Sequence, residues 1–319
     1  MNYFLVKLRF NSPVHFGPSD TALSLYTSGM RFYADTLFSA LCQTALIMKG
    51  QSGISALCGM VQTGNLLLSD SMPYSGNTLY LPKPCVVSDS KQEIPAEQRK
   101  AVKKAAWIPG TDLERFCQSI QGGTPYQIRY QPQFGTAQEE TKANLRDREH
   151  GTLPYPVGTY AFFPGCGLWF IVGCRDKEYF SSIRTLLTAL GLSGIGGKIS
   201  AGYGKFELCE AREIGDTEKW LLQGLKEQAN HYLLLTTSLP GEEELDEVLE
   251  DAYFQLTRRG GFVQSEKYAE EGRKKQTQYF LSSGSVLKRP FQGKLYDVGG
   301  EGKHPVYRYS CPVVLGVSL

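Results

Sequence analysis

Long apolar runs are missing from this 319-residue chain. No stretch reaches the roughly 18 consecutive apolar residues of a membrane-spanning helix, so no such helix is expected. The first apolar segment is interrupted by Lys7 and Arg9, so it lacks the core of a secretory signal. We therefore expect a soluble protein of the cytoplasm that does not bind membranes.

Metal-ligand spacing is missing as well. Eight cysteines are spread along the chain without a Cys-x-x-Cys pair, and the four histidines lie far from one another. Zinc sites normally place their ligands in tighter pairs. We also find no paired carboxylates supported by histidine and no Ser-His-Asp arrangement. The sequence therefore predicts reduced thiols, no metal and no cofactor.

An excess of one charge is also missing, because 34 Lys and Arg against 32 Asp and Glu leave a formal net charge of +2. Overall charge indicates nucleic-acid binding only in domains that are far more basic than this chain. Any RNA must therefore be bound by local clusters. With 41% hydrophobic residues the chain can bury a sizeable core, and its length favours two domains.

The first predicted domain spans residues 1–210. Apolar side chains alternate over residues 3–10, which predicts a strand packed on a core. The next elements in chain order are a helix with Asp35 as its N-cap that ends at 50–53, and strands over 65–68, 78–81 and 167–174. A helix capped by Asp176, with a buried stripe from Tyr179 to Leu190, and a strand over 205–209 complete the domain. This order is that of the split βαβ, ferredoxin-like fold, which RRM-type domains share.

Residues 83–165 do not fit that order, and we interpret them as an insertion that projects from the first domain. A basic helix is expected near its start, followed by an irregular polar stretch over 131–151. The basic helix carries Arg99, Lys100, Lys103 and Lys104, and the polar stretch carries Lys142, Asn144, Arg146 and Arg148. Acidic neighbours partly cancel this charge, so a solvated loop remains an alternative to a binding surface.

The second predicted domain spans residues 211–319. Its strands are expected over 232–237, 253–257, 278–281, 286–288 and 306–319, with an acidic helix over 242–251. The opening order of strand, helix and strand repeats the first domain, so the sequence predicts an α+β protein of two ferredoxin-like domains. Its candidate RNA contacts are the cations Arg258, Arg259, Lys288 and Arg289 with the aromatic Phe291.

A glycine-rich loop over 191–204 is the sharpest motif. Successive backbone amides can bind an anion, lysine adds charge, and tyrosine offers a face to a base. Its candidate contacts are Gly194, Gly196, Gly197, Lys198, Ser200, Ala201, Gly202 and Tyr203. The P-loop pattern fails because Ile199 follows Lys198, and both common nucleotide loops precede a helix whereas this one enters a strand. A flexible turn is the alternative without a function.

A helix, this loop and then a strand resemble the glycine-rich loop of the RAMP superfamily of CRISPR proteins. Three further segments agree: Lys7-Leu-Arg-Phe-Asn-Ser-Pro-Val-His-Phe-Gly17, Arg31-Phe-Tyr-Ala-Asp-Thr-Leu-Phe-Ser-Ala-Leu-Cys42 and Lys303-His-Pro-Val-Tyr-Arg-Tyr309. Together they resemble one branch, the fourth subunit of the subtype III-A Csm complex, which caps the 5′ end of the guide RNA and is related to the Cas-five group.

The resemblance implies a non-catalytic subunit that binds the 5′ handle of the guide RNA, the crRNA. It implies contact with the large Cas-ten subunit and with the backbone RAMP subunit of the complex. The insertion would act as a thumb near the target RNA. His15, Gly17 and Arg31 join the candidate RNA contacts on this basis.

Two other functions stay open. A related RAMP branch cuts CRISPR transcripts without metal, and His15 could serve as its acid and base, with Tyr203 or Lys198 as helpers. His15 could equally stabilise a turn or contact RNA. A general RRM-type RNA-binding protein is the other option, although no RNP-like aromatic strand is present.

Overall fold

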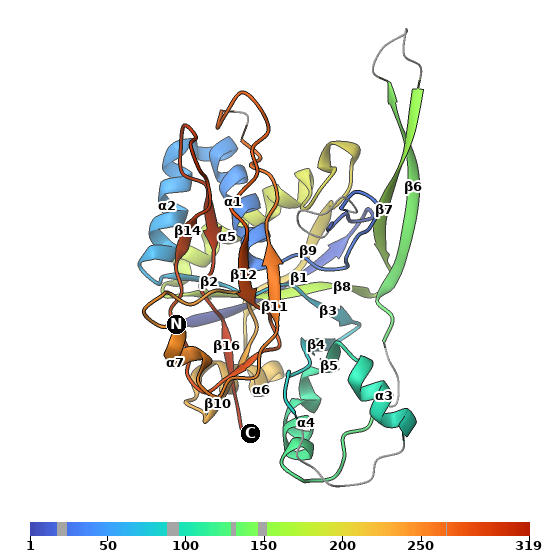
Figure 1. The fold of residues 1–319 in the computed structure, drawn as a ribbon, viewed down its shortest axis with the longest axis vertical. Helices are drawn as coiled ribbons and strands as arrows, with labels where there is room; N and C mark the ends of the chain where they lie inside the picture. The colour runs from blue at the N-terminus through green and yellow to red at the C-terminus, as the bar shows by residue number, and fades with distance from the viewer. Residues whose placement is uncertain (18–23, 88–95, 129–131, 146–151, 266) are drawn as a thin grey trace.

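The computed structural model describes residues 1–17, 24–87, 96–128, 132–145, 152–265 and 267–319. The fold is α+β and is built on antiparallel sheets (Figure 1). Within the described residues, no helix is both long and apolar enough to cross a membrane, and no three His, Cys, Asp or Glu side chains form a potential metal cluster. All eight cysteines are thiols.

A seven-stranded sheet forms the centre of the molecule. Its order is β5-β4-β3-β8-β1-β9, and β2 also pairs with β8. The strands are β1 (Asn2–Phe10), β2 (Leu66–Leu68), β3 (Met72–Ser75), β4 (Thr78–Pro82), β5 (Trp107–Pro109), β8 (Cys166–Cys174) and β9 (Phe206–Glu213). β1 lies between β8 and β9, with Leu5 opposite Ile171 and Arg212. The strands expected over residues 3–10, 65–68, 78–81, 167–174 and 205–209 are confirmed, whereas β3 and β5 were not foreseen.

Three helices cover one face of this sheet, α1 (Ala34–Lys49), α2 (Gln51–Gln62) and α5 (Lys177–Ser193) (Figure 1). Phe4, Val6 and Leu8 of β1 point into the core beneath them. Asp176 caps α5 as predicted, since its carboxylate accepts a hydrogen bond from the Glu178 amide. Tyr179 lies outside the buried stripe, because 36% of its surface stays exposed.

The start of α1 differs from the prediction. Its N-cap is Tyr33, and Asp35 lies inside the helix. The Ala34 amide donates to the buried Asp70 carboxylate, which takes the role expected of Asp35. At its other end α1 does terminate before Gly50, but that glycine, with φ of 66°, turns the chain directly into the unforeseen helix α2.

The C-terminal part of the chain covers the opposite face of the sheet with Leu221, Leu233 and Leu315. Its Tyr309 instead packs with Phe38 in the core on the helix-covered face. Its helices are α6 (Lys219–Lys226) and α7 (Leu245–Leu249), and its strands are β10 (His231–Leu234), β11 (Leu256–Arg259), β12 (Gln278–Leu281), β13 (Val286–Leu287), β14 (Leu295–Asp297), β15 (Tyr307–Tyr309) and β16 (Val314–Val317). They form a sheet of order β13-β10-β16 and the pairs β11-β12 and β14-β15. The helix expected over 242–251 is only five residues long.

One core joins the two parts. Leu5 and Ile171 of the central sheet pack in the same cluster as Leu233, Val286 and Leu315 of the C-terminal part. Both faces of β1 are therefore buried, whereas the sequence indicated one core-facing side. β9 also crosses residue 210, and the division of the chain at that point stays a prediction.

The insertion is more regular than expected. It contains α3 (Ala96–Lys104), which was predicted, and α4 (Leu113–Ile120). Short 3-10 turns occur here and elsewhere: η1 (Gly110–Asp112), η2 (Ile199–Ala201) and η3 (Asp216–Glu218). The described part of the polar stretch forms a regular strand, because β6 (Gly135–Leu145) pairs along its whole length with β7 (Thr152–Phe162). The resulting hairpin projects from the body of the molecule (Figure 1).

Candidate functional site

At positions 196 and 204 of the glycine-rich loop, the backbone lies so close to neighbouring atoms that only glycine fits. Gly196 has φ of 105°, and a Cβ there would lie 2.7 Å from the His15 carbonyl oxygen. A Cβ on Gly204, with φ of 74°, would lie 2.1 Å from the Ile195 carbonyl oxygen. Lys198 itself is left-handed, with φ of 58°. These glycines are therefore required by geometry, which argues against a merely flexible turn.

His15 lies beneath this loop. Its carbonyl accepts from the Gly197 amide at 2.9 Å, and its Nδ1 donates to the Gly158 carbonyl at 2.6 Å. Because that carbonyl can only accept, Nε2 is the nitrogen left without the proton in the neutral ring. Only 7% of His15 is exposed, at the edge of a hollow. His15 thus connects the turn after β1, the glycine-rich loop and β7.

The loop is also fastened to the hairpin. The Tyr203 hydroxyl donates to the Glu140 carboxylate at 2.6 Å, and the Lys142 ammonium lies 2.8 Å from the same carboxylate. Hydrogen bonds from Lys142 and then Tyr203 lower the pKa of Glu140. Tyr203 is only 4% exposed, so the structure does not offer its ring to a base. Lys198 lies 5.2 Å above the Tyr155 ring of β7.

Most other loop candidates face solvent. Gly196, Lys198, Ser200 and Ala201 are exposed, whereas Gly194 is buried and Gly197 and Gly202 are half-buried. On the hairpin, Lys142 lies in β6 as described, and Asn144 lies in β6 with its side chain outside the description. Arg146 and Arg148 lie outside the described residues.

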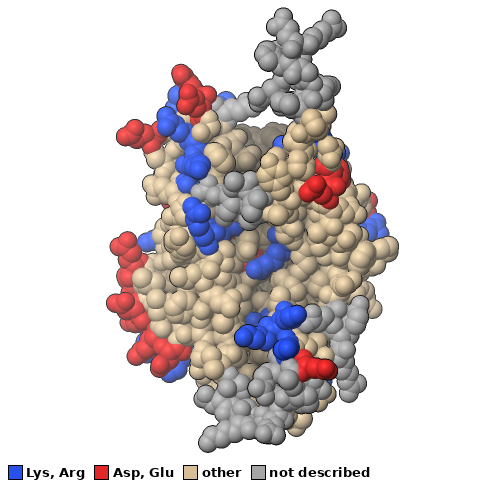
Figure 2. All heavy atoms as spheres, turned by 45° about the vertical axis from the view of Figure 1, so that its right-hand side comes forward, with Lys and Arg blue, Asp and Glu red and all other residues tan. Residues whose placement is uncertain are grey.

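Two adjoining hollows lie between the first part of the chain and the C-terminal part. The larger has a volume of about 1180 Å³ and the smaller about 320 Å³. Both are lined by Phe16, Gly17, Arg31, Tyr33 and Arg259. We call the two together the groove. Figure 2 shows basic side chains along the middle of one face of the molecule, whereas acidic side chains gather at its left edge.

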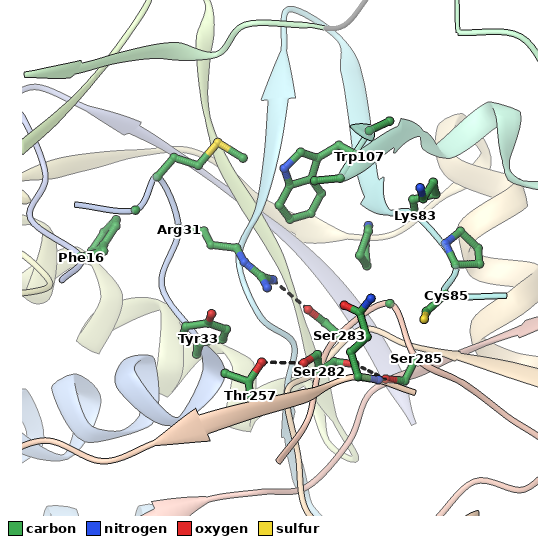
Figure 3. Close-up of a pocket in the computed structure, with 18 of the residues that line it drawn as sticks. Phe16, Arg31, Tyr33, Lys83, Cys85, Trp107, Thr257, Ser282, Ser283 and Ser285 are labelled. Atoms are coloured by element: carbon green, nitrogen blue, oxygen red, sulfur yellow. Dashed lines mark hydrogen bonds between the residues drawn. The ribbon is translucent and has the colours of Figure 1, made fainter. Parts of the chain in front are cut away.

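Arg31 stands at the centre of the larger hollow (Figure 3). Its guanidinium donates to Ser283 Oγ at 2.8 Å and lies 4.8 Å from the Tyr33 ring and 5.3 Å from the Trp107 ring. Behind it, Asp70 lies at 3.5 Å and is fully buried. Burial raises the pKa of Asp70, against the opposing effect of Arg31.

The rim of the larger hollow joins predicted cations to Lys83 and to hydroxyl groups that the sequence did not single out. The Lys83 ammonium donates to the Val102 carbonyl at 2.6 Å, near the end of α3, and Lys103 and Lys104 also line the hollow. Ser282, Ser283 and Ser285 line the opposite side with Thr257 and Arg258. Basic, aromatic and hydroxyl groups thus surround one space, which suits a charged ligand with flat rings.

Arg259 is buried rather than presented to a ligand. It donates through Nε and Nη2 to both oxygens of Asp35, at 3.0 and 2.6 Å. Arg308 approaches the same carboxylate at 3.8 Å and donates to the carbonyls of Arg259, Gly260 and Gln276. Burial acts to raise the pKa of Asp35, but Arg259 and then Arg308 outweigh it, and the pKa is lowered. Asp35 is therefore one partner in a buried ion network that joins α1 to the C-terminal part.

Three predicted contacts lie away from the groove. Lys288 pairs with Asp251 at 2.5 Å, and Arg289 lies 3.3 Å from Glu247. Phe291 is 8% exposed and belongs to a small core with Val248 and Leu287. The Phe291 ring is used for packing in this structure, and its contact with RNA stays a prediction. None of these three residues lines either hollow.

The fold and the groove define an α+β protein with a basic groove between two parts that share a core. A family model described as the CRISPR Csm4 C-terminal domain matches residues 227–317. The chain is 33% identical over 317 residues to "CRISPR system Cms protein Csm4" of Mycobacterium tuberculosis (strain CDC 1551 / Oshkosh), covering 99% of this chain and 98% of the relative. It is 28% identical over 315 residues to the protein of the same name from Streptococcus thermophilus, covering 98% of each. The chain belongs to the Csm4 family of CRISPR proteins, which confirms the predicted family.

Solved structures share the fold over the whole chain. A chain of a Csm1-Csm4 cassette in complex with pppApA matches with a TM-score of 0.65 at 20% identity, covering 100% of this chain and 99% of that one. A chain of a Csm3-Csm4 subcomplex in the type III-A CRISPR-Cas interference complex matches with a TM-score of 0.64 at 16% identity, covering 99% of each.

Proposed function

We propose that this chain is the non-catalytic RNA-binding subunit of a type III-A CRISPR Csm complex in the cytoplasm. It binds the 5′ handle of the crRNA and joins the large Cas-ten subunit to the backbone filament. The observation that carries this proposal is the groove, where the glycine-rich loop faces cations of the C-terminal part. Family membership and the solved assemblies of relatives with Csm1 and Csm3 support the partners.

The fold supports this proposal through its strand order. Taken as strand, helix, strand, strand, helix and strand, the order β9-β1-β8-β2 in the first part is that of the ferredoxin-like fold. We infer that the first part is such a domain. The C-terminal part begins with β10, α7 and further antiparallel strands, and we propose a second domain of the same ancestry.

A single-stranded RNA suits the chemistry of the groove. Lys103, Lys104 and Arg31 supply positive charge for phosphates, and Trp107 supplies an aromatic face beside Arg31. Ser283 and its hydroxyl neighbours supply donors and acceptors to base edges. Local concentration of charge explains how a chain with a net charge of +2 can bind a polyanion. The projecting hairpin is proposed as the thumb near the target RNA.

The rival function is metal-independent cleavage of CRISPR transcripts by His15. Its Nε2 could accept a proton, since Nδ1 is the donor to Gly158. However, the ring is buried and serves a structural hydrogen bond, and Tyr203 is engaged by Glu140. We therefore propose that His15 positions the glycine-rich loop and does not catalyse.

Gel electrophoresis of the purified chain with labelled repeat RNA, in the presence of EDTA, tests both functions. The expected result is a shift of the repeat RNA in native lanes, preferred over a scrambled RNA, without shortening in denaturing lanes. A shortened product that disappears in His15→Ala would establish the rival. If the chain alone gives no shift, the same gel with the large subunit added decides whether capping needs that subunit, and absence of binding there contradicts the proposal.

A matched pair of double variants locates the site. Gly196→Glu with Lys198→Glu should reduce RNA binding at least tenfold, because two carboxylates then face the phosphates. Gly215→Glu with Lys219→Glu makes the same chemical change outside both hollows, where a Cβ on Gly215 has open space. Equal loss in both pairs would show that net charge, not the loop, governs binding.

A further inference from the structure

The smaller hollow carries more positive charge than its neighbours neutralise. Its charged lining consists of Arg31, Asp35, Arg259, Lys275 and Arg308. Arg31 has Asp70 behind it as a counterion. Asp35 is then the one described carboxylate in the lining that faces the other three cations, so two positive charges are left without a counterion.

Two of these three cations already donate hydrogen bonds to other groups of the protein. Arg259 donates two hydrogen bonds to Asp35, and its guanidinium lies 4.2 Å from the centre of the Tyr33 ring. Arg308 is 3% exposed and donates to backbone carbonyls that shape the turn after β11. Both guanidiniums therefore serve mainly to build the wall of the hollow.

Lys275 differs from them. In the part of the chain that the structure describes, no carboxylate forms an ion pair with its ammonium, and no hydrogen bond of the ammonium is present. Burial lowers its pKa, and the nearby Arg308 and Arg259 lower it further against the opposing effect of Asp35. A half-buried ammonium among other cations destabilises the free protein unless an anion enters.

The opposite wall is formed by the backbone of the glycine-rich loop. Gly196, Gly197 and Ile199 line the hollow there, and a Cβ on Gly197 would lie 2.6 Å from His15 Cδ2. Gly196 and Gly197 bring no side chain to this wall, and the Gly197 amide donates to the His15 carbonyl. An oxyanion can therefore approach the backbone at Gly196 while the ammonium approaches from the other side. The volume of about 320 Å³ lies at the lower end of the range for small-ligand pockets.

We propose that the smaller hollow binds one phosphate group of the RNA and that Lys275 is its direct cationic ligand. Arg259 and Arg308 are positioning residues that hold the wall. This inference rests on the proposed function, and it assigns one phosphate to a single lysine of the basic run Arg273-Lys274-Lys275.

The decisive test scans the backbone of the repeat RNA with single methylphosphonates, each of which removes the charge of one phosphate. For the wild-type chain, one position should weaken binding about tenfold, the size expected for a charge-assisted hydrogen bond. Lys275→Met should bind unmodified RNA about tenfold more weakly and should lose that positional penalty. Lys274→Met, an exposed neighbour on the same segment, should keep it.

A second readout separates a phosphate ligand from a structural lysine. Without RNA, Lys275→Met should unfold at a higher denaturant concentration than the wild type, because an unpaired, half-buried charge is removed. A lysine needed for folding would give the opposite shift. Lys275→Arg, which retains the charge, should keep the methylphosphonate penalty even if the methionine variant were unstable.

The outcomes are distinct. If the wild type prefers repeat RNA but no methylphosphonate position depends on Lys275, this inference is overturned and the proposed function stands. If neither the chain nor its complex binds repeat RNA, both fail. If inorganic phosphate raises the melting temperature of the wild type alone while the RNA scan shows no Lys275-dependent position, the site binds a free oxyanion and the RNA assignment is overturned.

Discussion

The two walls of the smaller hollow are built by opposite means. The wall from the first part of the chain is backbone, shaped by Gly196 and Gly197 over His15. The wall from the C-terminal part is charge, with Arg259 and Arg308 fixed around Asp35. Adding a side chain at Gly196 should disrupt the backbone wall, whereas removing the Asp35 carboxylate should disrupt the charged wall. Variants that do one or the other therefore separate shape from electrostatics in the same site.

The largest effect is expected from Asp35→Ala, which leaves two buried guanidiniums without their carboxylate. We expect a loss of about 3–5 kcal/mol in the free energy of unfolding, the size typical of breaking a buried pair. Urea denaturation measures it. Asp176→Ala is the matched control, since it removes only an exposed N-cap and should cost about 1 kcal/mol. Similar losses in the two variants would contradict a special role for the charged wall.

The same carboxylate predicts a pH dependence. The pKa of Asp35 is lowered in the folded chain, so its stabilising contribution is present above the ordinary aspartate pKa of about 3.9. That contribution is lost as the pH falls through the lowered value. Asp35→Asn should therefore lose less stability on acidification than the wild type does, as followed by urea midpoints at decreasing pH.

The next largest effect tests the backbone wall. Gly196→Ala and Gly202→Ala impose a side chain on similar left-handed backbones, with φ of 105° and 89°. Only a Cβ on Gly196 would meet neighbours within 4 Å, namely the His15 carbonyl oxygen and the Phe16 ring. We expect a loss of about 1 kcal/mol for Gly202→Ala and about 2–3 kcal/mol for Gly196→Ala. Thermal melts of both variants measure the difference, and equal melting temperatures would mean that the close approach is relaxed at no cost.

A smaller effect is expected where the backbone wall meets the hairpin. Tyr203→Phe removes the hydrogen bond to Glu140 and keeps the ring, so about 1 kcal/mol should be lost locally. Hydrogen exchange of the amides in β6 and β7 should then accelerate. Tyr179→Phe, on the exposed side of α5, should leave that exchange unchanged. If Tyr203→Phe instead weakened RNA binding with normal exchange, the hydroxyl would contact RNA.

The smallest effect is expected from Lys288→Gln with Arg289→Gln. Their ion pairs are solvent-exposed and screened by water, so they contribute little to stability, and neither residue lines the groove. RNA affinity should change less than twofold in a filter-binding assay. A loss comparable to that of Lys275→Met would extend the RNA path across α7 and β13.

Local sequence patterns were enough to predict the elements whose conformation depends on nearby residues in the chain. The alternation of residues 3–10, the cap at Asp176 and the glycine spacing of 194–204 each express a local backbone requirement, and β1, α5 and the tight loop agree with them. The family resemblance depended on such segments too. These features could be predicted because the physics that produces them acts within a few residues.

The charged wall could not be predicted in this way. Asp35 and Arg259 are 224 residues apart, so no local pattern reveals that they neutralise each other. Asp35 at the start of a helix favoured a cap, and Arg259 beside Arg258 favoured an exposed cation. Phe291 next to basic residues favoured stacking, but its burial depends on α7. Arg308 did lie within the segment that carried the family resemblance, which was the one available signal.

The core shared by β1, β8 and the C-terminal sheet also bears on how the chain can be divided. Leu5 and Ile171 would face water if the C-terminal part were removed, and Leu233 and Leu315 would lose their partners. A gene fragment ending near residue 210 is therefore expected to yield aggregates, not a working half. A chimera of two relatives that joins the first part of one to the C-terminal part of the other would mismatch this core. Only exchange of both parts together preserves it, so the whole chain is expected to be exchanged as one unit.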